Sequence, residues 1–327
     1  MKIMFYDTKP YDKIWFQPLG EEMGYKIKFQ EVKLNEDTAI LAKNYDAVCI
    51  FVNDDAGKET IKALKELGVG TILLRCAGFN NVDLKAAKEA DIKVLRVPSY
   101  SPEAVAEYAM GLLLTVNRNI HRAYVRTRDF NYNINGLMGI DLVGKTVGVI
   151  GTGKIGQMMI DILKGFKMHI LAYDPYPVKG LDAEYVDLDR LFRESDVISL
   201  HCPLTKDTRH IINKKNIEKM KNGVLLVNTS RGGLINTGDL IEALMARKFA
   251  GVGLDVYEEE DEYFFEDKSN DIITDEDLIR LTSFRNVILT SHQAFFTRDA
   301  MEAIAKVTME NARAVEEGAE LKNQVLP

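Results

Sequence analysis

The sequence predicts an α/β protein built from two doubly wound parallel-sheet domains, and three observations support this. The chain of 327 residues exceeds the length that one hydrophobic core usually serves. Short runs rich in Val, Ile and Leu alternate with helical patterns, as buried parallel strands and their crossover helices do. One of these runs ends in a glycine-rich turn that opens a helix.

Residues 1–100 form the first alternating set. Strands are expected at 1–6, 25–29, 47–52, 71–74 and 92–97, and helices at 58–67 and 83–90. Polar or glycine-containing loops follow three of these strands, at 51–55, 75–81 and 97–102. Because ligands of open α/β sheets bind outside the carboxyl ends of the strands, these loops are candidate pocket walls.

A long helix is expected to run from Ser101 to about Asp129. Ser101 can cap it, and Pro102 suits its first helical position. Its middle, AMGLLLTV, is unusually apolar. Such a stretch fits a buried core helix, a subunit interface, or both.

The second alternating set predicts one domain over residues 101–298. Its strands are expected at 145–150, 168–173, 197–201, 223–228, 251–255 and 286–290, and its helices at 154–165, 187–194, 213–221 and 238–247. An acid-rich stretch at 258–277 is expected to be a solvated loop, since it lacks the spacing of a calcium loop. The last helix, 298–317, has the length and position to return to the first domain, which would comprise residues 1–100 and 299–327.

The glycine-rich turn follows the strand at 145–150 with the G-x-G-x-x-G spacing. Gly151 permits the tight turn, Gly153 lets the backbone approach a pyrophosphate, and Gly156 lets the helix pack closely on the strand. Asp174 ends the next strand, 18 residues beyond Gly156. A carboxylate there accepts ribose hydroxyls and repels a 2′-phosphate. The alternative is an ordinary tight turn, but the four features together favour a Rossmann site for NAD rather than NADP.

Composition excludes several other classes of function. The net charge of −7, from 42 basic and 49 acidic residues, leaves no basic footprint for nucleic acid or for an anionic membrane. Cys49, Cys76 and Cys202 lie far apart, so neither a disulfide framework nor a metal site is expected. The chain shows no signal-type segment and no apolar run long enough to span a membrane, so we expect a cytoplasmic protein.

Four polar residues lie at or just beyond the carboxyl ends of strands in the second domain: Arg231, Asp255, Glu260 and His292. A guanidinium can hold a carboxylate by two hydrogen bonds, and an imidazole can exchange a proton near neutral pH. A carboxylate beside the imidazole would orient it and stabilise its charged form. Taken singly, a histidine is more often structural. Two neighbouring carboxylates, Glu258 and Glu259, are equally good candidates for the role of Glu260 on composition alone.

Several segments resemble the D-isomer-specific 2-hydroxyacid dehydrogenases, and within them the NAD-dependent D-lactate dehydrogenase subgroup. They are RCAGFNNVD (75–83), RVPSYSPEAVAE (96–107), GKTVGVIGTGKIG (144–156), HCPLT (201–205), VNTSRGG (227–233), GLDVYEEE (253–260), FFEDKSND (264–271) and SHQAFF (291–296). The resemblance implies a Rossmann NAD domain and a flavodoxin-like substrate domain. It also implies that the long helix beginning at Ser101 serves a homodimer, or a dimer of dimers.

The resemblance assigns roles to particular residues. It implies that Arg231 binds the substrate carboxylate and that Glu260, rather than its neighbours, pairs with the acid/base His292. Implied substrate-binding residues are Ala77, Gly78, Tyr100, Phe51 and Phe295. Implied cofactor-binding residues are Gly151, Thr152, Gly153, Lys154, Ile155, Gly156, Asp174, Cys202, Pro203, Thr229, Ser230 and Asp255.

The expected reaction is the reversible, NADH-dependent reduction of pyruvate to D-lactate. In this interpretation His292 protonates the ketone as hydride arrives, and closure of the two domains excludes water. Two alternatives stay open. One is a dehydrogenase for a bulkier branched or aromatic 2-keto acid. The other is a non-catalytic, NAD-sensing protein of the corepressor type, which would keep the glycine turn without turning over a substrate.

Overall fold

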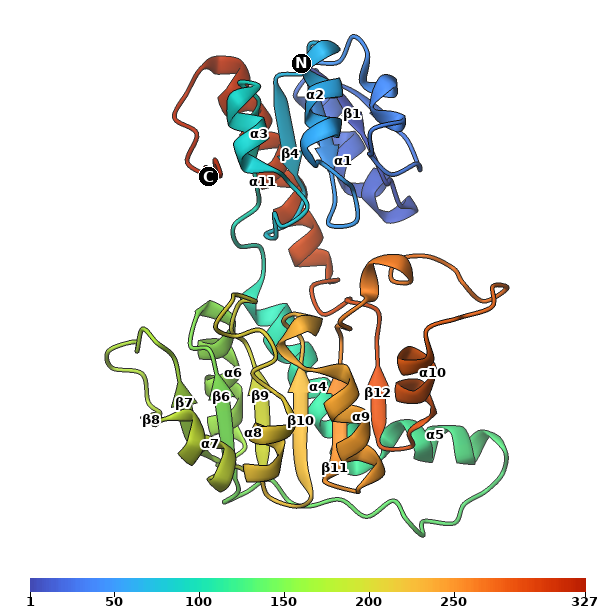
Figure 1. Cartoon of the computed structure of the whole chain (residues 1–327), viewed down its shortest axis with the longest axis vertical. Coiled ribbons are helices and arrows are strands. Elements are labelled where there is room, and N and C mark those ends of the chain that lie inside the picture. Colours follow the sequence, from blue (N-terminus) through green and yellow to red (C-terminus); the bar gives the residue numbers. More distant parts are fainter. The chain divides into compact units, whose positions relative to one another are not determined.

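The computed structural model describes residues 1–327 and divides into two compact units. Unit 1 comprises Met1–Ser101 and Phe296–Pro327, and unit 2 comprises Pro102–Phe295. Each unit has its own parallel β-sheet with helices packed on it (Figure 1). The predicted class, α/β with two doubly wound sheets, is therefore confirmed.

The sheet of unit 1 has five strands in the order β2-β1-β3-β4-β5. Every neighbouring pair is parallel. This order is that of flavodoxin-like folds. The strands are β1 (Lys2–Phe5), β2 (Lys26–Phe29), β3 (Ala47–Ile50), β4 (Thr71–Leu74) and β5 (Lys93–Leu95). The helices are α1 (Pro10–Glu22), the 3-10 helix η1 (Thr38–Ala42), α2 (Lys58–Glu66), α3 (Leu84–Glu89) and α11 (Arg298–Glu317).

The C-terminal helix α11 belongs to unit 1, although it is separated from the rest of that unit in sequence. It packs on α1 and β4. Asn311 donates to the carbonyl of Arg96 at 2.9 Å, and Glu316 pairs with the N-terminal amine at 2.7 Å. The helix ends at Gly318, whose φ of 65° supplies a left-handed cap.

Unit 2 has a seven-stranded sheet in the order β12-β11-β10-β9-β6-β7-β8. Its strands are β6 (Thr146–Ile150), β7 (His169–Tyr173), β8 (Glu184–Tyr185), β9 (Val197–Leu200), β10 (Val224–Asn228), β11 (Phe249–Leu254) and β12 (Val287–Leu289). Its helices are α4 (Pro102–Arg118), α5 (Ile120–Arg128), α6 (Lys154–Gly165), α7 (Leu188–Glu194), α8 (Lys214–Lys219), α9 (Thr237–Met245) and α10 (Glu276–Ser283), with 3-10 helices η2 (Gly232–Leu234) and η3 (Glu260–Glu262). The order in which the strands are added reverses between β6 and β9, which are parallel neighbours. This is the Rossmann switch point, at which dinucleotides bind.

Alternating side chains of the strands build a separate apolar layer on each face of this sheet. Val147 and Val149 of β6 pack in one layer with α4 and α6. Ile150 packs in the other layer with residues of α7, α8 and α9. The sheet is thus covered on both faces, so only the loops at strand ends remain available for a ligand.

The long helix expected from Ser101 to Asp129 is two helices. Asn119 separates α4 from α5 with a φ of 51°, a left-handed conformation that asparagine tolerates better than most residues. Helix α4 is largely buried within unit 2, whereas α5 buries none of its residues. The burial of its apolar side chains confirms that α4 is a core helix.

The acid-rich stretch 258–277 is not wholly a solvated loop, as the sequence had suggested. Phe264 is 5% exposed and joins the apolar layer of α7, α8 and α9. The stretch also contains η3, and α10 begins at Glu276. Elsewhere, all three cysteines are buried free thiols. None of the helices is both long enough and apolar enough to span a lipid bilayer.

Candidate active site

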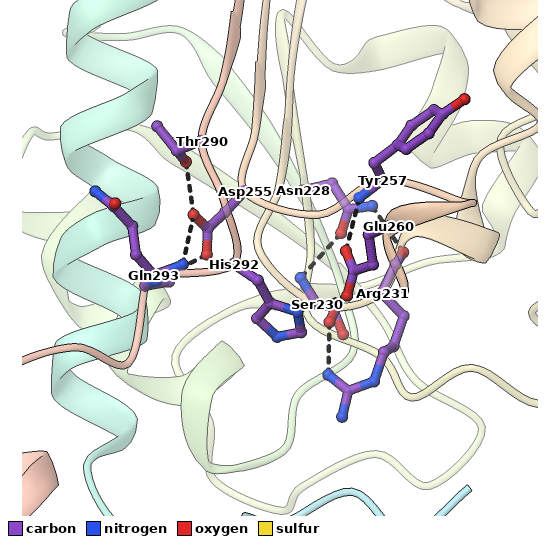
Figure 2. A network of polar contacts seen from close by, with 10 residues as sticks. Asn228, Ser230, Arg231, Asp255, Tyr257, Glu260, Thr290, His292 and Gln293 are labelled. Atoms are coloured by element: carbon purple, nitrogen blue, oxygen red, sulfur yellow. Dashed lines mark hydrogen bonds and ion pairs between the residues drawn. The ribbon is translucent and has the colours of Figure 1, made fainter. Parts of the chain in front are cut away.

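His292 and Glu260 form a close pair at the carboxyl end of the unit 2 sheet (Figure 2). The Nδ1 atom of His292 lies 2.6 Å from Oε1 of Glu260, and the side chains are 18% and 15% exposed. The other oxygen of Glu260 accepts from the backbone N–H of Tyr257 at 2.9 Å. A carboxylate facing Nδ1 places the ring proton there, which leaves Nε2 as the nitrogen able to exchange a proton.

Asp255 fixes the loop that carries His292. Its carboxylate accepts from Oγ1 of Thr290 at 2.6 Å, from the N–H of Gln293 at 3.0 Å and from the N–H of Ala294 at 2.7 Å. Its carbonyl oxygen accepts from the N–H of His292 at 2.7 Å. Burial raises the pKa of Asp255, and these hydrogen bonds oppose that rise.

His292 itself has a φ of 53°, a left-handed conformation that is uncommon outside glycine. Residues held in such conformations cluster at functional sites, and here the bonds to Asp255 hold the strained loop in place.

Arg231 lies beyond the end of β10 with most of its guanidinium uncommitted. Its Nη1 donates to the carbonyl of Ser230 at 2.7 Å. No carboxylate lies within ion-pair distance of the guanidinium, although the side chain is partly buried. Figure 2 shows Arg231 in the same group of strand-end residues as His292 and Glu260. A partly buried arginine without a counter-ion is suited to bind an anionic ligand.

The glycine turn after β6 has the space that a dinucleotide requires. A Cβ on Gly151 would meet the backbone of His201 and Cys202, and a Cβ on Gly156 would collide with the carbonyl oxygen of Gly151. At Gly153 a Cβ would meet nothing within 4 Å. Gly153 is also the N-cap of α6 and supplies no side-chain cap, so the first amides of that helix, including those of Lys154 and Ile155, are left for a pyrophosphate.

Asp174 is held beside this turn. One carboxylate oxygen accepts from the N–H of Thr152 at 2.7 Å and from its hydroxyl at 3.1 Å. The other accepts from the N–H of Tyr176 at 2.8 Å. The second oxygen, which accepts one hydrogen bond, keeps a lone pair for a ribose hydroxyl, whereas Thr152 uses both lone pairs of the first. Thr152, which is fully buried, therefore acts by orienting Asp174.

The loops after β9 and β10 complete the surroundings of the turn. Cys202 packs beside Gly151, and its carbonyl accepts from the hydroxyl of Ser230 at 2.7 Å. Pro203 follows on the exposed surface. The hydroxyl of Thr229 is buried without a hydrogen-bond partner in the chain, as expected of a group that a bound cofactor satisfies.

In unit 1, the loop after β4 presents two backbone amides. The N–H groups of Ala77 and Gly78 donate to no other group of the chain. The carbonyl of Ala77 accepts from Arg96 at 2.9 Å, which fixes the loop.

Phe51, after β3, is held at both its backbone and its ring. Its N–H donates to Asp54 at 2.6 Å, and its carbonyl accepts from Asn81 at 2.8 Å. The guanidinium of Arg75 lies 4.7 Å from its ring centroid. Tyr100 lies near the end of unit 1, partly buried, and Phe295 ends unit 2 at 8% exposure.

Comparisons with known proteins decide the family. Residues 110–294 match the model of the D-isomer specific 2-hydroxyacid dehydrogenase, NAD binding domain. The chain is 53% identical over 329 aligned positions to D-lactate dehydrogenase of Escherichia coli strain K12, with 100% of both chains covered. The chain belongs to the D-isomer-specific 2-hydroxyacid dehydrogenases.

Two solved structures agree with that assignment. The apo-structure of D-lactate dehydrogenase from Escherichia coli matches all of both chains, with a TM-score of 0.91 and 50% identity. D-lactate dehydrogenase with NAD⁺ from Lactobacillus jensenii matches all of both chains, with a TM-score of 0.84 and 30% identity. The chain is therefore an NAD-dependent D-2-hydroxyacid dehydrogenase, and its cofactor is NAD.

Sequence reasoning missed two features of the dehydrogenase site. The ring of Phe265, from the acid-rich stretch, lies 6.0 Å from that of His292. The amide of Gln293 donates to the hydroxyl of Tyr108 at 2.6 Å and so ties the histidine loop to α4. The aromatic pair inside an otherwise acidic stretch was the one available signal for Phe265. Nothing in the sequence marks Tyr108 as the partner of Gln293.

Proposed function

We propose that this dehydrogenase reduces pyruvate to D-lactate reversibly, with His292 as the acid/base, Glu260 as its partner and Arg231 as the carboxylate anchor. The observation that carries the proposal is the 2.6 Å contact between Nδ1 of His292 and Glu260, which leaves Nε2 for the substrate. The guanidinium of Arg231, most of which is uncommitted, supplies the positive charge that a 2-keto acid needs.

The residues of the chain account for binding and proton transfer. When bound, the nicotinamide supplies the hydride. Arg231 holds the substrate carboxylate through two parallel hydrogen bonds from its guanidinium. Protonated His292 donates its Nε2 proton to the carbonyl oxygen as the carbon is reduced, and in the reverse direction the neutral ring accepts the proton of the hydroxyl. Glu260 keeps the ring oriented through both proton states, because its own second oxygen is held by the Tyr257 N–H.

We propose that unit 2 is the NAD-binding domain and unit 1 the substrate domain. Unit 1 would contribute the amides of Ala77 and Gly78 as further donors to the carboxylate, and Phe51 and Tyr100 as apolar walls for the methyl group. Phe295 of unit 2 would be a further apolar wall for the methyl group. The ring of Phe51 lies against Arg75, and its backbone is held by Asp54 and Asn81. A wall fixed in this way cannot easily move aside for a larger side chain, which supports a small substrate.

A substrate panel tests the assignment. The measurement is kcat/KM with NADH for pyruvate, 2-ketoisocaproate and phenylpyruvate, together with the chirality of the product. We expect pyruvate to be preferred and the product to be D-lactate. A clear preference for either larger acid would overturn the lactate assignment in favour of the bulkier-substrate alternative. Tight NADH binding without turnover of any 2-keto acid would favour a sensing protein.

The variant His292→Ala tests the proposed mechanism. We expect kcat to fall by ~100-fold or more, since a positioned general acid contributes about that factor, while NADH binding is unchanged. Turnover near that of the wild type would show that another group donates the proton.

We also propose a cytoplasmic homodimer, alone or as half of a dimer of dimers. Three free cysteines are consistent with a reducing compartment. The dimer is supported by the segment formed by α5 and residues 129–145, which we call the arm. The arm exposes large apolar side chains, with Phe130 80%, Tyr132 72%, Ile134 79% and Met138 93% exposed. Such a concentration is typical of a surface covered by another protein, and a second copy of the chain is the partner we propose.

A further inference from the structure

Glu258 lies two residues before Glu260, yet its carboxylate is committed to a different set of partners. Oε1 lies 2.5 Å from Nε2 of His210 and 3.3 Å from Nη2 of Arg209. Oε2 accepts from the hydroxyl of Thr237 at 3.2 Å and from its N–H at 3.4 Å. The side chain is only 14% exposed. A carboxylate this enclosed, with four donors around it, is fixed in position.

These partners come from the loops that carry the proposed site. Arg209 and His210 lie in the loop after β9, Thr237 begins α9 directly after the Arg231 loop, and Glu258 lies in the loop after β11 that carries Glu260. One carboxylate therefore joins three neighbouring strand-end loops.

The backbones of the same loops are interlocked around this carboxylate. The N–H of His210 donates to the carbonyl of Gly233 at 2.9 Å, so the histidine is joined to the Arg231 loop through its backbone and to Glu258 through its ring. Gly232, the residue after Arg231, packs so closely on the peptide between Tyr257 and Glu258 that a Cβ there would collide with it. A shift of the Glu258 loop would therefore displace the peptide beside Arg231.

We propose that Glu258 is a positioning residue that holds Arg231 and Glu260 in register, with His210 as its principal partner. The inference rests on the proposed roles of Arg231 and Glu260. Neither Glu258 nor His210 forms a hydrogen bond or ion pair with His292. Their effect is exerted through the two loops, so it reaches substrate binding through Arg231 and proton transfer through Glu260.

A purely structural role makes a different prediction. If the carboxylate only stabilised the fold, its loss would lower the melting temperature and leave the kinetics of the folded enzyme unchanged. If it positions the site, the KM for pyruvate rises and kcat falls in enzyme that is fully folded. NADH affinity changes less than the KM for pyruvate in that case, because neither the glycine turn nor Asp174 forms a hydrogen bond with Glu258.

The test compares Glu258→Gln with Glu259→Gln. Both remove one negative charge at adjacent positions, but Glu259 is exposed and has no hydrogen-bond partner. The measurements are kcat and KM for pyruvate, the NADH dissociation constant by fluorescence, and the melting temperature. We expect kcat/KM of Glu258→Gln to fall about tenfold or more, since misplacement of reacting groups by ~1 Å can cost ~100-fold. For Glu259→Gln we expect kinetics within about twofold of the wild type.

Equal kinetics for the two variants would overturn the inference. If the wild type reduced no 2-keto acid, the proposed function would be overturned instead, so the two failures are distinguishable.

A second pair keeps the test decisive should Glu258→Gln fail to fold. His210→Gln retains an N–H donor for Glu258, whereas His210→Ala removes it. We expect the alanine variant to lose kcat/KM and the glutamine variant to recover most of it. Wild-type kinetics in both variants would refute the positioning role.

Discussion

Arg231 is the residue at which substrate binding is most directly testable. Arg231→Lys keeps the positive charge but replaces the planar fork with an ammonium that cannot make two parallel hydrogen bonds. The KM for pyruvate should therefore rise by about tenfold or more, because charge-assisted hydrogen bonds contribute roughly 1.5–3 kcal/mol each. Steady-state kinetics with a parallel NADH titration measure this. An unchanged KM would place the substrate carboxylate elsewhere.

His201 links the stability of the enzyme to pH without taking part in the proposed chemistry. Burial lowers the pKa of His201 from 6.5 to about 4. Its Nδ1 is buried without a partner, and its Nε2 lies 2.8 Å from the hydroxyl of Ser199. The folded chain thus keeps this ring neutral over a range in which the unfolded chain protonates it. The stability is present above pH 6.5 and is lost as the pH falls toward 4.

The prediction is that wild-type enzyme loses more free energy of unfolding than His201→Gln when the pH is lowered from 6.5 to 4. The excess should be up to ~3 kcal/mol, the linkage value of a shift of this size. Urea unfolding across the pH series measures it, with each variant referred to its own value above pH 7. Parallel curves for the two proteins would show that His201 is not held neutral.

At this scale the types and positions of the site residues were predictable, whereas their contacts were not. Arg231, Glu260 and His292 were expected at strand ends, and they are found there. Composition alone could not separate Glu260 from Glu258, because both are carboxylates in the same loop. The separation depends on which imidazole each one reaches, His292 or His210, and those histidines come from different loops.

Among the elements, the unit formed by β6, the glycine turn and α6 contains glycines whose substitution should affect NADH binding and folding separately. A methyl group at Gly153 meets nothing in the chain, so Gly153→Ala should fold normally yet weaken NADH binding about tenfold or more, because it fills space reserved for the pyrophosphate. Gly156→Ala should lose both stability and binding, since its Cβ would collide with the Gly151 carbonyl.

Gly165→Ala is the matched control in the same helix. A Cβ at Gly165 meets nothing within 4 Å, so NADH affinity should be unchanged and stability should rise by about 0.5–1 kcal/mol. NADH fluorescence titration and thermal unfolding distinguish the three variants. Wild-type NADH affinity in Gly153→Ala would contradict the pyrophosphate site.

Elements with a clear periodicity of apolar residues were predictable from the sequence, and elements that depend on tertiary contacts were not. Helix α6 begins and ends where the sequence placed it, because a glycine turn opens it and an apolar stripe continues through it. Helix α1 escaped notice because Pro18 lies inside it and its apolar residues form no continuous stripe. The break at Asn119 escaped notice for another reason: the helical pattern continues across it, and only the left-handed backbone reveals it.

For the whole molecule, the order of the strands followed from rules of chain connection rather than from composition. A doubly wound domain has later strands on both sides of its first strand, and both observed sheet orders have this arrangement. The return of α11 to unit 1 was expected from the length and position of the last helix, but the contacts that hold it there were not predictable. It depends on contacts such as that between Asn311 and Arg96, which lie far apart in the sequence.

Assembly is the property of the whole molecule that the arm should control. In Figure 1 the arm begins with helix α5 after α4 and then continues as a long loop along the lower edge of unit 2 to β6. Its exposed apolar side chains are costly in water, so a second copy that covers them is favoured by roughly 25 cal/mol per Å² of apolar surface buried. We expect the wild type to have a native mass of at least twice its chain mass of 36.9 kDa.

Met138→Glu combined with Ile134→Glu should release monomers, because both side chains would place a charge in the buried interface. Met245→Glu is the control, since Met245 is also exposed, at 66%, but lies at the end of α9 rather than in the arm. Light scattering coupled to size exclusion at several micromolar concentrations measures the masses. The arm would be excluded as the interface if the double variant kept the wild-type mass, or if Met245→Glu dissociated the enzyme equally well.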